Sequence, residues 1–245
     1  MKLEVIPVAQ DAEDRSFKNA VAVVIDVLRA TTSIQAILEN GGGRVFPVAG
    51  LEEARELKKS RPTALLCGER GGYPPPGFDM GNSPVGFAEA DLAGRDIILT
   101  TTNGTLAVSH AKKAEHLYSG CIRNVVATAD VVGEHKDVRN VVILCAGTEG
   151  RFSIEDFYAA GLLVSHLARR ENAELTDIAW AAVKLAEQPL PTVVNETTCS
   201  HYAALIAKGF GEDVSYALGI GNSSKIADGC AIVPVFDRGL SCFCA

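Results

Sequence analysis

Short apolar runs rich in β-branched residues alternate along the chain with longer stretches in which apolar residues recur at helical spacing. The short runs predict strands at residues 3–8, 20–27, 44–48, 63–67, 97–101, 141–145 and 231–236. Residues 20–27 are almost continuously apolar, which is typical of a strand buried on both faces.

Helices are predicted between these strands. Helical periodicity or capping signals mark residues 31–40, residues 51–60, a helix that begins at Ser83 and Pro84, most of residues 157–186, and residues 203–217. Repeated strand–loop–helix units predict a three-layer α/β/α fold with a mixed, mostly parallel sheet. No linker rich in Pro, Ser or Gly divides the chain, so we expect a single domain over residues 1–245.

The net charge limits the choice of partner. The chain has 23 Lys and Arg against 30 Asp and Glu, a formal net charge of −7. We therefore do not expect it to bind nucleic acid or an anionic membrane, because both need a basic surface. An anionic ligand would need positive charge supplied locally.

The ends and the cysteines indicate a cytoplasmic protein. The first ten residues show no secretory signal. The longest purely apolar runs have about six residues, whereas a membrane-spanning helix needs roughly 18. The seven cysteines and five histidines lack the spacing of zinc ligands, so zinc is not expected and the histidines are interpreted as surface or core residues.

Four polar clusters follow predicted strands, at the edge where open α/β sheets bind ligands. In the first cluster, Asp26 lies at the end of an apolar run and Arg29 lies three residues later. A buried carboxylate without a partner is unfavourable by several kcal/mol. Asp26 therefore needs either Arg29 or a cation, and both interpretations remain open.

The second cluster is the loop of residues 68–83. It holds three consecutive prolines together with Glu69, Arg70 and Asp79. Long loops inside compact domains are usually functional or disordered. Because the prolines stiffen this loop, we expect an ordered active-site loop, with a plain surface excursion as the alternative.

The third cluster, residues 100–105, lies at a predicted helix start and contains Thr102, Asn103 and Gly104. Backbone N–H groups, hydroxyls and amides together form a cradle for an anion there, helped by the helix dipole. Ordinary N-capping by Thr102 or Asn103 is the alternative.

The fourth cluster runs from Cys145 to Asp156. Asp156 projects from the first turn of a predicted helix, and Ser153 three residues earlier resembles a capping box. Cys145 and Arg151 have the Cys-x5-Arg spacing of cysteine-dependent phosphatases. That chemistry would require a thiol with a lowered pKa.

Together the clusters supply carboxylates and arginines without histidine or cysteine partners. Hard carboxylate oxygens favour Mg²⁺ over zinc, and arginines suit phosphate, carboxylate or sulfonate groups. The combination predicts metal-assisted phosphoryl chemistry on a small polyanion.

At these clusters the sequence resembles the 2-phosphosulfolactate phosphatase (ComB) family. The matching segments are VVIDVLRATTSI, GERGGYPPPGFDMGNSP, TTTNGT and CAGTEGRFSIEDFYAAG. The resemblance implies a Mg²⁺-dependent phosphatase that converts 2-phosphosulfolactate to 3-sulfolactate and phosphate, a step of coenzyme M biosynthesis. It also implies an α/β fold peculiar to this family.

We assign candidate roles at the positions of these motifs. The candidate Mg²⁺ ligands are Asp26, Glu69, Asp79 and Asp156. The candidate catalytic residues are Asp26, Arg29, Thr102 and Asn103. The candidate substrate-binding residues are Arg70, Asn82, Ser83, Gly104 and Arg151. The attacking group is water or Asp26 itself, and water is preferred because Asp26-Val27-Leu28 lacks the second aspartate of an Asp-x-Asp motif.

Several alternatives remain open. The substrate could be another phosphorylated hydroxy acid, the enzyme could be a cysteine-dependent phosphatase that uses Cys145 and Arg151, or the chain could be a non-catalytic module that binds small anions. The expected partner is a small anionic phosphate ester, and two copies could pair as a homodimer through their C-terminal helices. Residues 195–198 and 221–224 could each cap a helix or reach the site.

Overall fold

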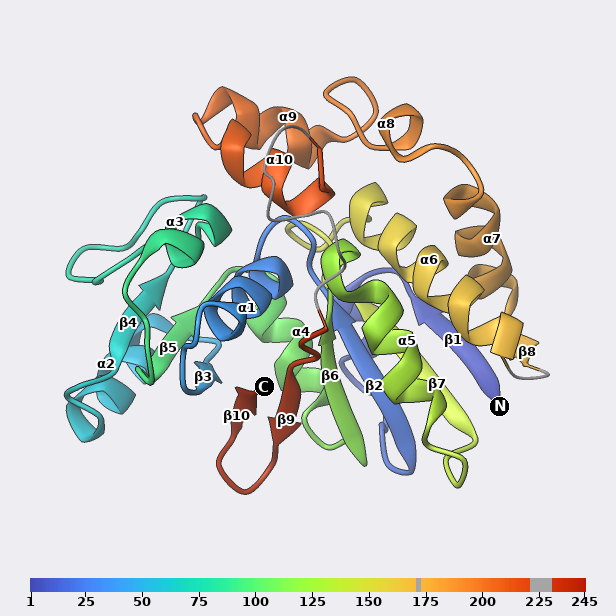
Figure 1. The fold of residues 1–245 in the computed structure, drawn as a ribbon, viewed down its shortest axis with the longest axis horizontal. Helices are drawn as coiled ribbons and strands as arrows, with labels where there is room; N and C mark the ends of the chain where they lie inside the picture. Colours follow the sequence, from blue (N-terminus) through green and yellow to red (C-terminus); the bar gives the residue numbers. More distant parts are fainter. Residues whose placement is uncertain (171–172, 221–230) are drawn as a thin grey trace.

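One ten-stranded sheet runs through the part of the chain that the computed structural model describes, residues 1–170, 173–220 and 231–245 (Figure 1). The strand order is β4-β5-β3-β10-β9-β6-β2-β7-β1-β8. The strands are β1 (Lys2–Ile6), β2 (Ala20–Ile25), β3 (Val45–Pro47), β4 (Leu65–Gly68), β5 (Ile97–Thr100), β6 (His116–Gly120), β7 (Asn140–Cys145), β8 (Glu174–Leu175), β9 (Val235–Asp237) and β10 (Cys242–Cys244).

The sheet consists of two parallel groups joined by an antiparallel hairpin. Strands β4, β5 and β3 pair in parallel, and so do β6, β2, β7, β1 and β8. Strands β9 and β10 pair antiparallel with each other, and each pairs antiparallel with one of the two groups. The sheet is therefore mixed and mostly parallel, as the repeated strand–helix pattern predicted.

Helices cover both faces of this sheet. They are α1 (Ala30–Glu39), α2 (Leu51–Ser60), α3 (Pro84–Glu89), α4 (Gly104–Ala111), α5 (Val125–Gly133), α6 (Ile154–Arg170), α7 (Asp177–Ala186), α8 (Leu190–Val193), α9 (Ser200–Ala207) and α10 (Gly211–Leu218), with short 3-10 turns η1 (Ala9–Ala12) and η2 (Ile122–Asn124). Helices α5, α6 and α7 share a core with one face of the central strands, and α1 and α4 share a core with the other. The predicted α/β fold with helices on both faces is confirmed.

Strand β2 shows how one apolar run supplies both cores. All six of its residues are buried. Val21, Val23 and Ile25 pack on the side of α5, α6 and α7, whereas Ala22 and Val24 pack on the side of α1 and α4. Because both faces are covered, the residues that directly follow the carboxyl end of β2 lie in a buried environment.

The C-terminal part differs from the sequence prediction. Residues 157–186, predicted to be mostly helical, are divided between α6 and α7 with β8 between them. Residues 203–217 are divided between α9 and α10 by Gly209, whose φ of +86° is a conformation that glycine adopts without penalty. The predicted strand at 231–236 is shorter, since β9 begins at Val235.

Residues 195–198 form a turn before α9. The side-chain Oδ1 of Asn195 accepts hydrogen bonds from the N–H groups of Thr197 (2.9 Å) and Thr198 (3.2 Å). This segment therefore caps local backbone. Residues 221–224 lie outside the described residues. Among the helices that are described, none is long and apolar enough to cross a membrane.

Candidate active site

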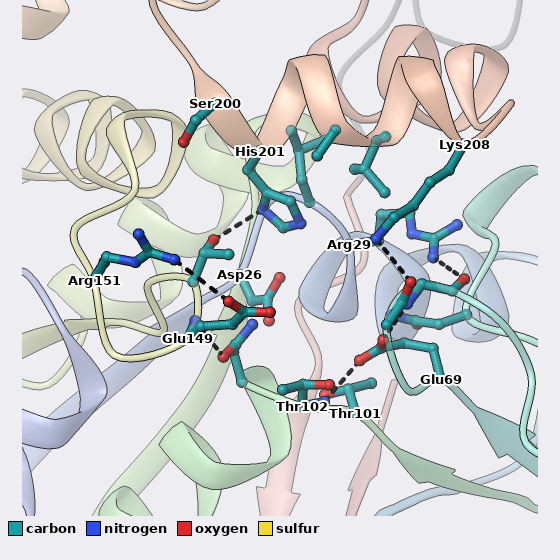
Figure 2. A pocket seen from close by; sticks show the side chains of 18 of the residues that line it. Asp26, Arg29, Glu69, Thr101, Thr102, Glu149, Arg151, Ser200, His201 and Lys208 are labelled. Atoms are coloured by element: carbon teal, nitrogen blue, oxygen red, sulfur yellow. Dashed lines mark hydrogen bonds and ion pairs between the residues drawn. The ribbon is translucent and has the colours of Figure 1, made fainter.

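A cavity of about 420 Å³ lies where four strands end. The segments that directly follow β2, β4, β5 and β7 line it, and α9 covers it from the opposite side (Figure 2). The four polar clusters predicted at strand ends therefore meet at one place, the edge where α/β sheets bind ligands. The charged and imidazole side chains of its wall are Asp26, Arg29, Glu69, Glu149, Arg151, His201 and Lys208.

Asp26 lies directly after β2 and is almost fully buried, with 6% of its surface exposed. Its Oδ1 accepts a hydrogen bond from the N–H of Ala30 (3.1 Å). Burial raises the pKa of Asp26 to about 6; the charge of His201 and the Ala30 hydrogen bond oppose this shift, whereas the charges of Glu69 and Glu155 add to it. A buried carboxylate near other carboxylates favours a bound proton or cation.

Arg29 also lines the cavity, but its guanidinium binds groups other than Asp26. Its Nη1 forms a buried ion pair with Asp213 Oδ2 (2.6 Å), and its Nη2 donates to the carbonyl of Gly72 (2.8 Å). The guanidinium also lies over the ring of Phe210, 4.1 Å from the centroid. Arg29, one of the two partners that the sequence allowed for Asp26, is therefore bound to other groups.

The helix start at Thr102 and Asn103, predicted to cradle an anion, holds a carboxylate of the protein itself. Glu69 Oε1 accepts a hydrogen bond from the N–H of Thr102 (2.7 Å), and Glu69 Oε2 accepts one from the N–H of Gly72 (2.8 Å). Asn103 Oδ1 accepts from the N–H of Glu149 (3.0 Å). The attraction of this helix start for negative charge is thus already used, in part, to position Glu69 (Figure 2).

Asn82 and Gly104 shape the cavity in different ways. Asn82 lines it and is 3% exposed, and its Oδ1 has no hydrogen-bond partner within the described residues. A buried acceptor without a partner is unfavourable, so this oxygen is available to a ligand. Gly104 begins α4 against Asp26, where a Cβ would lie only 2.7 Å from Asp26 Oδ2, so glycine leaves the space that this carboxylate occupies.

Arg151 and Lys208 supply positive charge from opposite sides of the cavity (Figure 2). The Arg151 side chain is 80% exposed and its Nη2 lies 3.5 Å from Glu149 Oε2. Lys208 is exposed and its Nζ donates to the carbonyl of Gly71 (2.8 Å). Because both side chains reach solvent, they can turn toward a bound anion.

Asp156, predicted to bind a metal, does not line the cavity. Its side chain is buried, and its two oxygens accept hydrogen bonds from the N–H groups of Val27 (2.8 Å) and Gly147 (3.0 Å). Burial raises the pKa of Asp156 well above its usual range, and the charges of Glu155 and Asp26 add to this shift. Each carboxylate oxygen of Asp156 is thus occupied by a backbone donor. The side chain joins the segment that follows β2 to the segment that follows β7.

Asp79 and Arg70, predicted to bind metal and substrate, also lie outside the cavity. Asp79 Oδ2 accepts a hydrogen bond from the N–H of Leu66 (2.7 Å), which fixes the returning end of the loop to β4. Arg70 Nη2 donates to the carbonyl of Ala49 and to the hydroxyl of Thr100, both at 3.0 Å. The folding of the loop turns both side chains toward its supporting strands.

Ser83 has a capping role rather than the predicted contact with substrate. Its Oγ accepts a hydrogen bond from the N–H of Gly86 (3.0 Å) at the start of α3, as the sequence indicated, and donates to Asp213 Oδ1 (2.5 Å). Asp213 thus joins Ser83 to Arg29. Asp213 could not be predicted as part of this network, because no local sequence pattern marks it.

The cysteine-dependent alternative does not fit this geometry. Cys145 is the last residue of β7, is fully buried and does not line the cavity. Burial raises the pKa of its thiol well above the usual range, and the charges of Asp156 and Glu155 raise it further. A cysteine nucleophile needs the opposite shift, so the position and the raised pKa of Cys145 are those of a core residue.

His201, which the sequence alone led us to interpret as a surface or core residue, lines the cavity. Its imidazole projects from α9 into the cavity (Figure 2). Its Nδ1 lies 3.0 Å from Thr148 Oγ1 and 3.1 Å from Glu155 Oε1. A lone histidine without a second ligand at a fixed spacing gives no sequence signal, and only the packing of α9 over the strand ends reveals it.

The cavity is not a preformed metal cage. Within the described ranges, no group of three or more His, Cys, Asp and Glu side chains is arranged to hold a metal ion. Asp26, Glu69 and Glu149 are the carboxylates of the wall. A cation here would need water or a bound ligand to complete its coordination.

The fold and the site define an α/β protein with a strand-end cavity whose arginine and lysine side chains suit a small anionic ligand, with carboxylates in the same wall. Residues 6–228 match the family model of 2-phosphosulpholactate phosphatase. The chain belongs to this family of phosphoric monoester hydrolases.

Related proteins agree over most of the chain. A probable 2-phosphosulfolactate phosphatase of Carboxydothermus hydrogenoformans is 42% identical over 84% of this chain and 83% of its own length. Proteins with the same name from Clostridium perfringens and Clostridium beijerinckii are 36% and 33% identical, and they cover 88% and 98% of this chain and the same shares of their own lengths.

Proposed function

We propose that this chain is a Mg²⁺-dependent phosphatase that hydrolyses 2-phosphosulfolactate to 3-sulfolactate and phosphate, a reaction of the coenzyme M biosynthesis type. The observation that carries the proposal is the buried Asp26 carboxylate in the wall of a cavity that also presents Arg151 and Lys208. The names of the family and of the relatives supply the choice of substrate.

The cavity matches the charges of such a substrate. Phosphate, sulfonate and carboxylate groups are all anionic, and Arg151 and Lys208 approach from opposite walls. Arginine binds a planar pair of anionic oxygens through two N–H groups, whereas lysine acts as a point charge. We therefore assign the carboxylate or sulfonate to Arg151 and a second anionic group to Lys208, with Arg29 as a fixed positive charge behind them.

The wall residues fit Mg²⁺ better than they fit a metal held entirely by protein. Mg²⁺ is commonly held by one or two carboxylates, with waters and substrate phosphate as its other ligands. Asp26 would hold the ion, and the unpartnered Oδ1 of Asn82 offers a second hard oxygen. The ion would neutralise charge on the phosphoryl oxygens.

The nucleophile in this proposal is water, which attacks phosphorus opposite the ester oxygen. Thr102 and Asn103 line the cavity, and the Thr102 hydroxyl and the Asn103 side-chain amide N–H would donate to phosphoryl oxygens, since the Thr102 N–H is held by Glu69. Attack by Asp26 itself is the alternative. A trapped aspartyl-phosphate at Asp26 would identify that route.

A phosphate-release assay tests the proposal. 2-Phosphosulfolactate and 2-phospholactate are compared side by side, with Mg²⁺, without it, and after EDTA treatment. We expect Mg²⁺-dependent release that is faster with the sulfonated substrate. If the chain binds these esters but releases phosphate from none of them in the presence of Mg²⁺, it is an anion-binding module and the proposal is overturned.

The cysteines support a cytoplasmic location for this activity. The six cysteines that the structure describes are all free. Free thiols persist in reducing compartments, whereas exported proteins usually pair them. Fractionation of the producing cells with an antibody to the chain would test this assignment.

A further inference from the structure

His201 is held with one ring nitrogen fixed and the other free. Its Nδ1 lies 3.1 Å from Glu155 Oε1, and Glu155 is 1% exposed at the side chain. Thr148 Oγ1 lies 3.0 Å from the same nitrogen and is itself held by Ser153 Oγ at 2.6 Å. Within the described residues, Nε2 has no hydrogen-bond partner, and the ring projects into the cavity (Figure 2).

This arrangement decides which nitrogen exchanges a proton. A carboxylate beside Nδ1 accepts its N–H and fixes the tautomer, as it does in other carboxylate–histidine pairs. Nδ1 therefore keeps its hydrogen in both charge states of the ring. Nε2 is left as the atom that gains and loses a proton on the cavity side.

The surroundings favour the protonated ring. Burial lowers the pKa of His201, but the hydrogen bond and charge of Glu155 and the charge of Asp26 outweigh burial and the opposing charge of Arg29, so that the pKa is raised. These groups come from α6, from the end of β2 and from the start of α1, the elements that face the ring. An imidazolium with a free Nε2–H is a proton donor aimed at the cavity.

Hydrolysis of an alkyl phosphate needs such a donor. The leaving group of a phosphorylated 2-hydroxy acid is a strongly basic alkoxide, and its departure is slow unless a proton reaches the ester oxygen. A positioned general acid contributes roughly 10²- to 10⁴-fold to such a step. The cavity wall contains no other imidazole within the part of the chain that the structure describes.

We propose that His201 is the general acid of the reaction and that Glu155 is its positioning residue; this inference rests on the proposed phosphatase function. Water oxygen forms a bond to phosphorus while the bond from phosphorus to the ester oxygen breaks. The electron pair of that bond stays on the ester oxygen, which takes the Nε2 proton and leaves as the hydroxyl of the product. One proton of the attacking water passes to solvent, and Nε2 is protonated again from solvent.

The test compares two substrates that differ in leaving-group basicity. They are 2-phosphosulfolactate and its 3,3-difluoro analogue, which have the same charge, although the fluorinated alkoxide is less basic. For His201→Gln we expect kcat to fall by about 10²- to 10⁴-fold on the first substrate and by a much smaller factor on the second. We also expect the kcat of the wild type to fall as rising pH deprotonates the imidazolium, and this fall to be absent in His201→Gln.

Glu155→Gln gives a second, independent measurement. Because Glu155 raises the pKa of His201, its removal should move the basic limb of the kcat profile to lower pH while KM changes little. His166→Gln, on α6 and outside the cavity wall, is the matched control and should leave both rate and profile unchanged. Thermal unfolding of each variant checks that it folds.

Two outcomes overturn the inference. One is full activity of His201→Gln on 2-phosphosulfolactate. The other is an equal loss on both substrates with an unchanged basic limb, which would make His201 a structural residue. Failure of the proposed function is distinguishable, since the wild type itself would then release no phosphate from either substrate.

Discussion

Arg29 and Asp213 form a buried ion pair, 2.6 Å between Nη1 and Oδ2, that joins residues 184 positions apart in the sequence. Asp213 also accepts the hydroxyl of Ser83, and Arg29 also donates to the carbonyl of Gly72. The pair therefore ties α10 to the segment after β2 and to the loop after β4. The positive charge of Arg29 in the cavity wall is held in place by the same contacts that hold the wall together.

Replacing Arg29 by methionine should lower the free energy of unfolding substantially. Asp213 would be left buried and unpaired, which costs about 3–5 kcal/mol in the free energy of unfolding. Urea denaturation measures this change. Arg55→Met is the matched control, because its ion pair with Glu52 is exposed and should contribute less than about 1 kcal/mol. Equal losses in the two variants would show that the buried pair has no special structural role.

Asp26→Asn should abolish most turnover and leave the fold intact. The amide keeps an acceptor for the N–H of Ala30 and removes a buried charge, so the free energy of unfolding should change little. Loss of the carboxylate should lower kcat by about 100-fold or more, the scale of losing one electrostatic contact in a transition state. Phosphate release and circular dichroism are the two measurements.

Asp79→Asn is the matched control for Asp26→Asn. Asp79 lies in a segment with the same family resemblance but outside the cavity, and an amide oxygen can still accept the N–H of Leu66. It should keep near wild-type turnover. If Asp26→Asn retained half of the wild-type rate, the assignment of Asp26 would be wrong whatever Asp79 showed.

The fold could be predicted where sequence pattern is local. Apolar runs located β2 and β7, and the charged helix α2 has the predicted bounds. Strand β6 was missed because His116–Gly120 contains few apolar residues and is buried by its place between β2 and β9. Strand β10 was missed because it has only three residues, which form a strand by pairing antiparallel with β9.

Only those site residues that directly follow a predicted strand could be placed at the cavity from the sequence. Asp26 and Glu69 follow strands closely, so their arrival at the cavity needed only the rule for α/β sheets. Asp79 was misplaced because the path of its loop decides its direction, and no pattern encodes that path. His201 on α9 and Lys208 directly after it reach the cavity through long-range packing that a single sequence does not reveal.

Gly104→Ala should damage both stability and catalysis. A Cβ at this position would lie 2.4 Å from Ala30 Cβ and 2.7 Å from Asp26 Oδ2, so the carboxylate must move. Overpacking of this kind costs roughly 1–3 kcal/mol, and misplacing a reacting group by about 1 Å can lower kcat by about 100-fold. Gly133→Ala in α5 is the control, because its nearest neighbour is 3.9 Å away and alanine favours the helix by up to about 1 kcal/mol. Wild-type kcat in Gly104→Ala would show that Asp26 tolerates displacement.

Cys145→Ala separates the metal-dependent route from the cysteine route. Because burial keeps the Cys145 thiol protonated, we expect the variant to retain phosphate release within about a factor of two, and EDTA to abolish release in both variant and wild type. Inactivity of the variant combined with indifference of the wild type to EDTA would establish the cysteine mechanism instead.

Protonation of His135 should destabilise the fold in mild acid. Burial lowers the pKa of His135, and the stacked ring of His116, 4.0 Å away between centroids, lowers it further. The unfolded chain therefore binds a proton at higher pH than the folded chain does. This contribution to stability is complete above about pH 6.5, the ordinary histidine pKa, and is lost as pH falls through the lower folded value.

His135→Gln keeps a polar group near the hydroxyl of Tyr118, which lies 2.6 Å from His135 Nε2. Urea midpoints measured between pH 7.5 and pH 5 should decline less in this variant than in the wild type. Parallel declines in the two proteins would mean that other groups cause the acid sensitivity.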